Sequence, residues 1–143
     1  MMAIKQKIDF ETVKRRISEM DLAKTDMVIG IAEGGMPPAK LISEKLGCGL
    51  CRVKFSYRND DNVPIHTVPL LLEEPVLKEG IADILIVDDV SVSGRTLKSA
   101  CALFAEYNVR TLVLIGTADH VVFPEIRSCV TWPWKKGNND AGE

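Results

Sequence analysis

The sequence predicts an α/β fold with a doubly wound parallel sheet, and three observations carry that prediction. Short apolar runs recur along the chain, at residues 27–32, 84–87 and 109–116. Stretches with apolar residues at helical spacing alternate with these runs. Glycine-rich or acidic segments follow the first two runs directly, as at the carboxyl ends of buried parallel strands. Such alternation is typical of a parallel sheet with helices on both faces.

Each element has its own local justification. Asp9 can cap a helix whose apolar residues include Val13 and Ile17, while the pair Pro37-Pro38 opens a second helix that Gly47 ends. The predicted elements, in chain order, are a helix over 10–20, a strand over 27–32, a helix over 39–46, a strand over 51–57, an irregular loop over 60–75, a strand over 84–87, a helix over 96–107 and a strand over 109–116.

Length and composition narrow the class of protein. A chain of 143 residues, 46% of them apolar, predicts one domain over residues 1–143 with a substantial core. A net charge of −2 gives no reason to expect nucleic acid or an anionic membrane as partner. No apolar run is long enough to span a bilayer, and the N-terminus lacks the apolar core of a signal peptide. We therefore expect a cytoplasmic protein, with a disordered tail over about 137–143.

The segment ILIVDDVSVSGRTL, residues 84–97, is the most informative part of the chain. A buried strand that stops abruptly at two carboxylates, Asp88 and Asp89, is followed by a hydroxyl-rich loop, Gly94 and a helix start. Unpaired backbone N–H groups at a helix start suit a phosphate, and carboxylates suit sugar hydroxyls or a divalent cation. The simpler alternative is a capped helix after an ordinary turn, but capping needs only one acid.

This segment resembles the phosphoribosyl-pyrophosphate (PRPP) signature of the type I phosphoribosyltransferases, nearest to the small bacterial and archaeal xanthine and hypoxanthine-guanine enzymes. The resemblance implies transfer of ribose 5-phosphate from PRPP to a nucleobase, with a purine as the first expectation. It also implies Mg²⁺ as cofactor and a role in nucleotide salvage. The resemblance also implies that Asp88 and Asp89 are the catalytic residues and that they bind magnesium, directly or through water. The loop that it implies for binding the 5-phosphate consists of Val90, Ser91, Val92, Ser93, Gly94, Arg95 and Thr96. PRPP and a nucleobase are the expected partners, and we expect a homodimer.

The loop after the first predicted strand, Glu33-Gly34-Gly35, resembles the pyrophosphate loop of the same family. Two glycines leave backbone N–H groups available to an anion, although an ordinary strand-to-helix turn has the same composition. Glu33 departs from the family pattern, which places a cation there. Either Glu33 points away while backbone and magnesium bind pyrophosphate, or pyrophosphate binds poorly.

The C-terminal segment resembles the hood of the 6-oxopurine enzymes, over about residues 118–136. Val130, Trp132 and Trp134 are the candidate base contacts, since a tryptophan offers a flat apolar face on which a base can stack. The alternative is that both tryptophans fix the tail to the core. Val92 and Lys135 stand where oxopurine enzymes carry acids, and with Glu33 they motivate a second hypothesis, a PRPP- or nucleotide-binding regulator without turnover.

One further segment has a predicted role. Residues 60–75 would fold over the site and exclude water, with Tyr57 and Arg58 at its base as candidate phosphate contacts.

Overall fold

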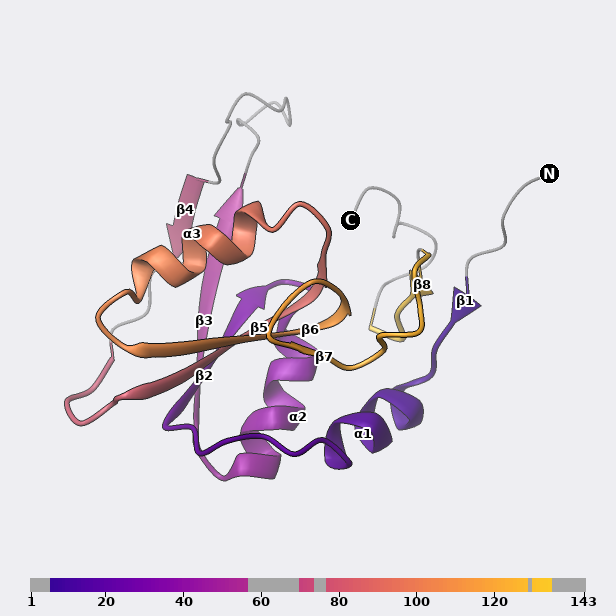
Figure 1. Ribbon diagram of the computed structural model, residues 1–143, viewed down its shortest axis with the longest axis horizontal. Coiled ribbons are helices and arrows are strands. Elements are labelled where there is room, and N and C mark those ends of the chain that lie inside the picture. The colour runs from indigo at the N-terminus through magenta and orange to yellow at the C-terminus, as the bar shows by residue number, and fades with distance from the viewer. Residues whose placement is uncertain (1–5, 57–69, 74–76, 129, 135–143) are drawn as a thin grey trace.

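A computed structural model of the protein describes residues 6–56, 70–73, 77–128 and 130–134 (Figure 1). Its elements, in chain order, are β1 (Gln6–Lys7), α1 (Phe10–Ser18), β2 (Met27–Ala32), α2 (Met36–Leu46), β3 (Gly49–Ser56), β4 (Leu70–Glu73), β5 (Asp83–Ser91), α3 (Arg95–Leu103), β6 (Asn108–Gly116), β7 (His120–Val121) and β8 (Val130–Thr131).

The main sheet has six strands in the order β4-β3-β2-β5-β6-β7. Five of them run parallel. The edge strand β4 is the exception and pairs antiparallel with β3. Helices α1 and α2 cover one face of this sheet and α3 covers the other (Figure 1). The doubly wound parallel sheet predicted from the sequence is therefore confirmed.

Each face of the sheet has its own apolar core. Val13, Ile17 and Ile42 from α1 and α2 pack on one face, together with Phe123 and Trp132. On the other face the α3 residues Leu97 and Ala100 pack against buried strand residues such as Val53, Ile86 and Val113. Burial of this apolar surface is the main force that holds the layers together. Among the described residues, no helix is long and apolar enough to cross a membrane.

The local signals for two helices act as predicted. Asp9 accepts a hydrogen bond from the Thr12 backbone N–H at 2.8 Å and caps α1. Pro37 and Pro38 lie in the first turn of α2, and Gly47 ends that helix at φ 67°, a left-handed conformation that favours glycine.

Three differences from the predicted elements are larger than shifts of a few residues at an end. Strand β5 does not stop at Val87 but continues to Ser91, because β6 runs beside it and pairs Ser91 with Gly116. Helix α3 ends at Leu103, short of the predicted residue 107. Part of the loop predicted over 60–75 is a strand, β4, which finds a partner in β3. Residues 57–69 and 74–76, including Tyr57 and Arg58, lie outside the described residues.

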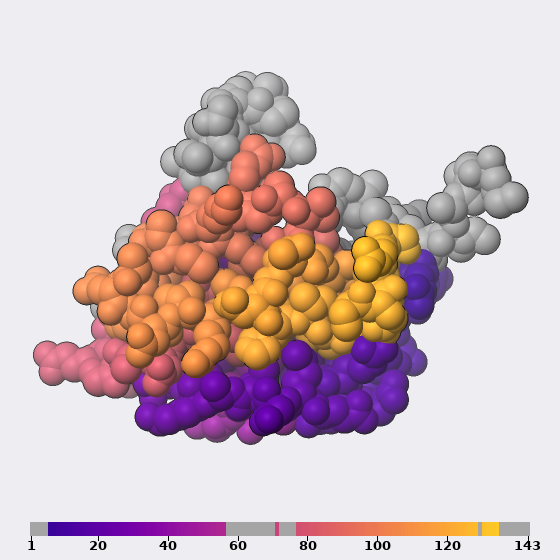
Figure 2. Space-filling model, in the orientation of Figure 1, coloured from indigo at the N-terminus to yellow at the C-terminus, as the bar shows by residue number. Residues whose placement is uncertain are grey.

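The C-terminal segment closes over the end of the sheet as a small addition, which we call the hood (residues 118–128 and 130–134). Its strand β8 pairs in parallel with β1, so that Gln6 lies beside Val130 and Lys7 beside Thr131. In Figure 2 the yellow C-terminal segment lies directly against the indigo N-terminal segment. The hood is thus held by the first residues of the chain, a long-range pairing that the sequence did not indicate.

Candidate functional site

The two carboxylates of the acidic motif lie near the carboxyl end of β5. Asp88 is buried, with 9% of its surface exposed, and Asp89 is half-buried. Each carboxylate accepts a hydrogen bond from the next backbone N–H: Asp89 N donates to Asp88 Oδ1, and Val90 N donates to Asp89 Oδ1, both at 2.8 Å. These short local bonds fix the two carboxyl groups at the strand end.

The glycine loop after β2 packs directly on this acid pair. A Cβ added to Gly34 would lie 2.2 Å from Asp89 Oδ2, and one added to Gly35 would lie 2.5 Å from Val87 O. The second contact is to backbone, so only glycine fits at residue 35. Gly35 N also donates to Ile31 O at 2.8 Å. The two motifs, which the sequence separates by more than 50 residues, therefore form one site. We call residues 33–35 and 88–96 the acidic edge.

Glu33 turns toward the neighbouring strand β3. Its Oε2 atom lies 2.9 Å from Lys54 Nζ and 3.2 Å from Arg52 Nη2. The hydrogen bond from Lys54, aided by the nearby Arg52 charge, lowers the pKa of the Glu33 carboxyl below its ordinary value. Strand β3 thus brings two cations to the loop, which the sequence did not indicate.

The predicted phosphate loop leads from β5 into α3. Ser91 is buried, whereas Val92 has 87% of its surface exposed. Gly94 stands at the start of α3 with φ 80°, and a Cβ there would meet open space. Among the described residues no side chain caps α3 at Gly94, while Ser93 Oγ accepts a hydrogen bond from Arg95 N at 3.3 Å. The positive end of the α3 dipole thus opens toward the loop.

A cavity of about 320 Å³ lies between this loop and the hood. Its walls come from the ends of β5 and β6 and from the hood: Ser91, Val92, Ile115, Gly116, Thr117, Val121, Phe123, Pro124, Ile126 and Arg127. Of these residues, only Ser91 and Val92 are predicted from the sequence to belong to the site. Thr117, Phe123 and Arg127 were missed, although the position of residue 117 just after a strand of the parallel sheet was the available signal.

The candidate base contacts of the hood do not line this cavity. Trp132 has 3% of its surface exposed and packs between two other rings, with centroids 5.4 Å from Trp134 and 6.1 Å from Phe123. Val130 is buried in β8. In this arrangement Trp132 has no surface on which a base can stack. For Trp132 the structure therefore favours the alternative in which the ring fixes the tail to the core, while Trp134 is half-buried beside it.

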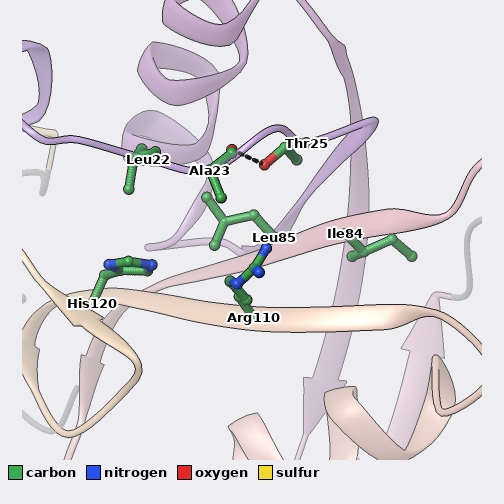
Figure 3. A pocket seen from close by; sticks show the side chains of 7 residues that line it. All are labelled: Leu22, Ala23, Thr25, Ile84, Leu85, Arg110 and His120. Atoms are coloured by element: carbon green, nitrogen blue, oxygen red, sulfur yellow. Dashed lines mark hydrogen bonds between the residues drawn. The ribbon is translucent and has the colours of Figure 1, made fainter.

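A second, much smaller cavity lies at the opposite, amino end of the sheet (Figure 3). Its volume is about 10 Å³, and Leu22, Ala23, Thr25, Ile84, Leu85, Arg110 and His120 line it. Such a volume holds about one water molecule. This cavity is therefore too small to hold a substrate.

Comparison with known proteins agrees with this arrangement. The family model for the phosphoribosyl transferase domain matches residues 2–141. A purine phosphoribosyltransferase from Pyrococcus horikoshii has a similar fold, with a TM-score of 0.70 at 24% identity, over 93% of this chain and 95% of that one.

Two curated relatives are each 28% identical to the chain. One is the orotate phosphoribosyltransferase of Sulfurisphaera tokodaii, matched over 76% of this chain and 51% of the relative. The other is the transcriptional regulator GfcR of Methanocella arvoryzae, matched over 67% of this chain and 46% of the relative. The chain thus spans about half the length of the curated relatives it matches.

Proposed function

The chain belongs to the phosphoribosyl transferase domain family, and from that premise we propose that it transfers the ribose 5-phosphate of PRPP to a nucleobase. The bond between the anomeric carbon and pyrophosphate breaks, a bond to a ring nitrogen of the base forms, and the base loses a proton. The observation that carries the proposal is the packing of Gly34 and Gly35 on Val87 and Asp89. It brings the candidate pyrophosphate loop, the acid pair and the phosphate loop to one edge of the sheet.

Each part of PRPP is bound by a different set of residues. Asp88 and Asp89 accept hydrogen bonds from the ribose hydroxyls and favour the positive charge that develops at the anomeric carbon as pyrophosphate leaves. The loop over 90–96 and the start of α3 hold the 5-phosphate. The backbone N–H of Gly34 faces the leaving pyrophosphate, since that of Gly35 already donates to Ile31 O.

Magnesium fits the donor groups at this edge. Two neighbouring carboxylates, Asp88 and Asp89, offer the hard oxygen ligands that this ion prefers. Within the described part of the chain no three acidic, histidine or cysteine side chains are placed to hold a metal ion. Asp88 and Asp89 would therefore hold it jointly with substrate oxygens, the usual arrangement for magnesium. When bound, it would supply positive charge beside the leaving group.

A purine is the proposed base. The cavity between the loop and the hood, about 320 Å³, is large enough for a bicyclic ring and is lined by Val92, Ile115 and Phe123. Thr117 and Arg127 add hydrogen-bonding groups to the same walls. The similar structure from Pyrococcus horikoshii is a purine enzyme, whereas one curated relative is an orotate enzyme. A role in nucleotide salvage, a cytoplasmic location and a homodimeric assembly belong to the same proposal.

A turnover screen tests this function. Purified protein is incubated with magnesium and PRPP plus adenine, guanine, hypoxanthine, xanthine or orotate, and the nucleotide and pyrophosphate formed are measured. Formation of a purine nucleotide is the expected result. Turnover of orotate alone would overturn the purine assignment, and absence of PRPP binding would overturn the function.

A regulatory role is the second candidate, because one curated relative is a transcriptional regulator and Glu33 replaces the expected cation. The two candidates differ in one readout. A regulator binds PRPP or a nucleotide in this site but forms no product with any base.

A further inference from the structure

We infer that Arg52 and Lys54 of β3 provide the positive charge that binds the pyrophosphate group, and that Glu33 is an internal counter-ion which this group replaces. The inference rests on the proposed function. It names the residues that neutralise the pyrophosphate group, because the glycine loop itself carries no positive charge.

The first step of the argument is placement. Lys54 pairs in the sheet with Ala32, the residue directly before Glu33, and Arg52 pairs with Gly30. Because side chains alternate along a strand, both cations point to the same face of β3 while Val53 between them is fully buried on the other. They therefore reach the end of β2, beside Gly34, which itself contacts the Asp89 carboxylate.

The second step is charge. Both cations lie within hydrogen-bond distance of the same carboxylate oxygen, Glu33 Oε2. Two positive groups thus share one carboxylate oxygen beside the glycine loop. The cations that the family pattern places in the loop are thus delivered from the neighbouring strand, and Glu33 sits where an anionic ligand oxygen would bind.

The third step is exchange. The Glu33 side chain is 66% exposed, and those of Arg52 and Lys54 are 41% and 35% exposed. Ion pairs this exposed are weak, so separating Glu33 from the cations takes little free energy. Pyrophosphate offers more negative charge and several acceptor oxygens to the same two donors. A carboxylate left beside it would repel it. Pyrophosphate therefore displaces Glu33, and Glu33 lowers the affinity of the site.

Binding measurements on single variants test this inference, with magnesium pyrophosphate and ribose 5-phosphate as separate probes. Arg52→Gln and Lys54→Gln should each weaken pyrophosphate binding by about tenfold, because a charge-assisted hydrogen bond is lost. Lys54→Arg keeps the charge and should retain the affinity. Glu33→Gln should tighten pyrophosphate binding by about threefold, since a competing charge is removed.

Ribose 5-phosphate lacks the pyrophosphate group and should bind equally to all these variants. Lys24→Gln is the matched control: Lys24 pairs with Asp26 at 3.6 Å before β2, at the other end of the sheet. It should leave both affinities unchanged.

The outcomes separate the inference from the function on which it rests. Unchanged pyrophosphate affinity in Arg52→Gln and Lys54→Gln, with ribose 5-phosphate still bound, would overturn the inference alone. Weaker pyrophosphate binding in Glu33→Gln would show that Glu33 orients the cations instead of competing for them, which also overturns it. A wild-type protein that binds neither probe would overturn the proposed function itself.

Discussion

The acidic edge and the hood face each other across one cavity but are built in different ways. At the acidic edge, the backbone of Gly34 packs on the Asp89 carboxylate and that of Gly35 packs on the Val87 backbone, too closely for a side chain at either glycine. The hood is held by side chains: Arg16 of α1 donates to Val122 O at 2.9 Å and lies 4.7 Å from the centre of the Phe123 ring. The comparison indicates a rigid acidic edge, which is the ribose-phosphate side under the proposed function, and a hood held by side-chain contacts, which is the base side.

The largest expected effect is at the acidic edge. Gly35→Ala should lower the free energy of unfolding by about 3 kcal/mol, because the new Cβ would lie 2.5 Å from Val87 O and 2.6 Å from Ile31 O, backbone atoms that cannot move aside. Urea denaturation measures the loss. Gly80→Ala is the control, since residue 80 has φ 88° but open space around it, and should cost about 1 kcal/mol. Equal losses in the two variants would contradict a rigid edge.

Gly94→Val should have the next largest effect. Its φ of 80° strains a β-branched residue by about 2 kcal/mol, and the added branch should block ribose 5-phosphate at the start of α3. Gly47→Val is a close match, because Gly47 has φ 67° and open surroundings at the end of α2. Both variants should lose similar stability in urea. Only Gly94→Val should lose ribose 5-phosphate binding in calorimetry, and binding retained there would place the phosphate elsewhere.

Replacing Asp88 and Asp89 together with Asn should weaken magnesium-PRPP binding at least about tenfold, or about 1.4 kcal/mol. Folding should survive, because each Asn retains an acceptor oxygen for the backbone N–H that the carboxylate now binds. Asp83→Asn removes a charge at the start of the same strand and should leave PRPP binding intact. PRPP titration with thermal melting checks both points; unchanged affinity in a folded double variant would refute the ribose assignment.

On the hood side, Arg16→Ala should cost about 1 kcal/mol of stability through the loss of the Val122 hydrogen bond and the Phe123 contact. Because Phe123 also lines the cavity, KM for the base should rise while KM for PRPP stays constant. Arg15→Ala, one residue earlier on the exposed side of α1, should change neither. A rise in both KM values would mean that Arg16 supports the whole site and not the hood alone.

The two regions also differ in how well the sequence predicted them. The acidic edge consists of short motifs, so strand β2 and the position of β5, though not its end, followed from residues within one local stretch. The same holds for the Asp9 cap and the Gly47 stop elsewhere in the chain. The hood depends on contacts far apart in sequence, such as the pairing of β1 with β8 and the contact of Arg16 with Val122. The contact of Arg52 and Lys54 with Glu33 was not predicted for the same reason, since only the sheet register brings these residues together.

The smallest expected effect concerns Glu33. From the sequence alone, Glu33→Arg is expected to tighten PRPP binding by adding a cation beside pyrophosphate, a gain of about 1 to 3 kcal/mol before desolvation. The structure lowers this expectation, because the new guanidinium would stand beside Arg52 and Lys54 and be repelled by both. Most of the gain should therefore come from removal of the carboxylate. Glu33→Arg and Glu33→Gln should differ by less than about twofold in their affinity for magnesium-PRPP, measured by calorimetry. A Glu33→Arg variant that binds magnesium-PRPP much more tightly than Glu33→Gln would show that a cation in the loop adds to the binding provided by Arg52 and Lys54.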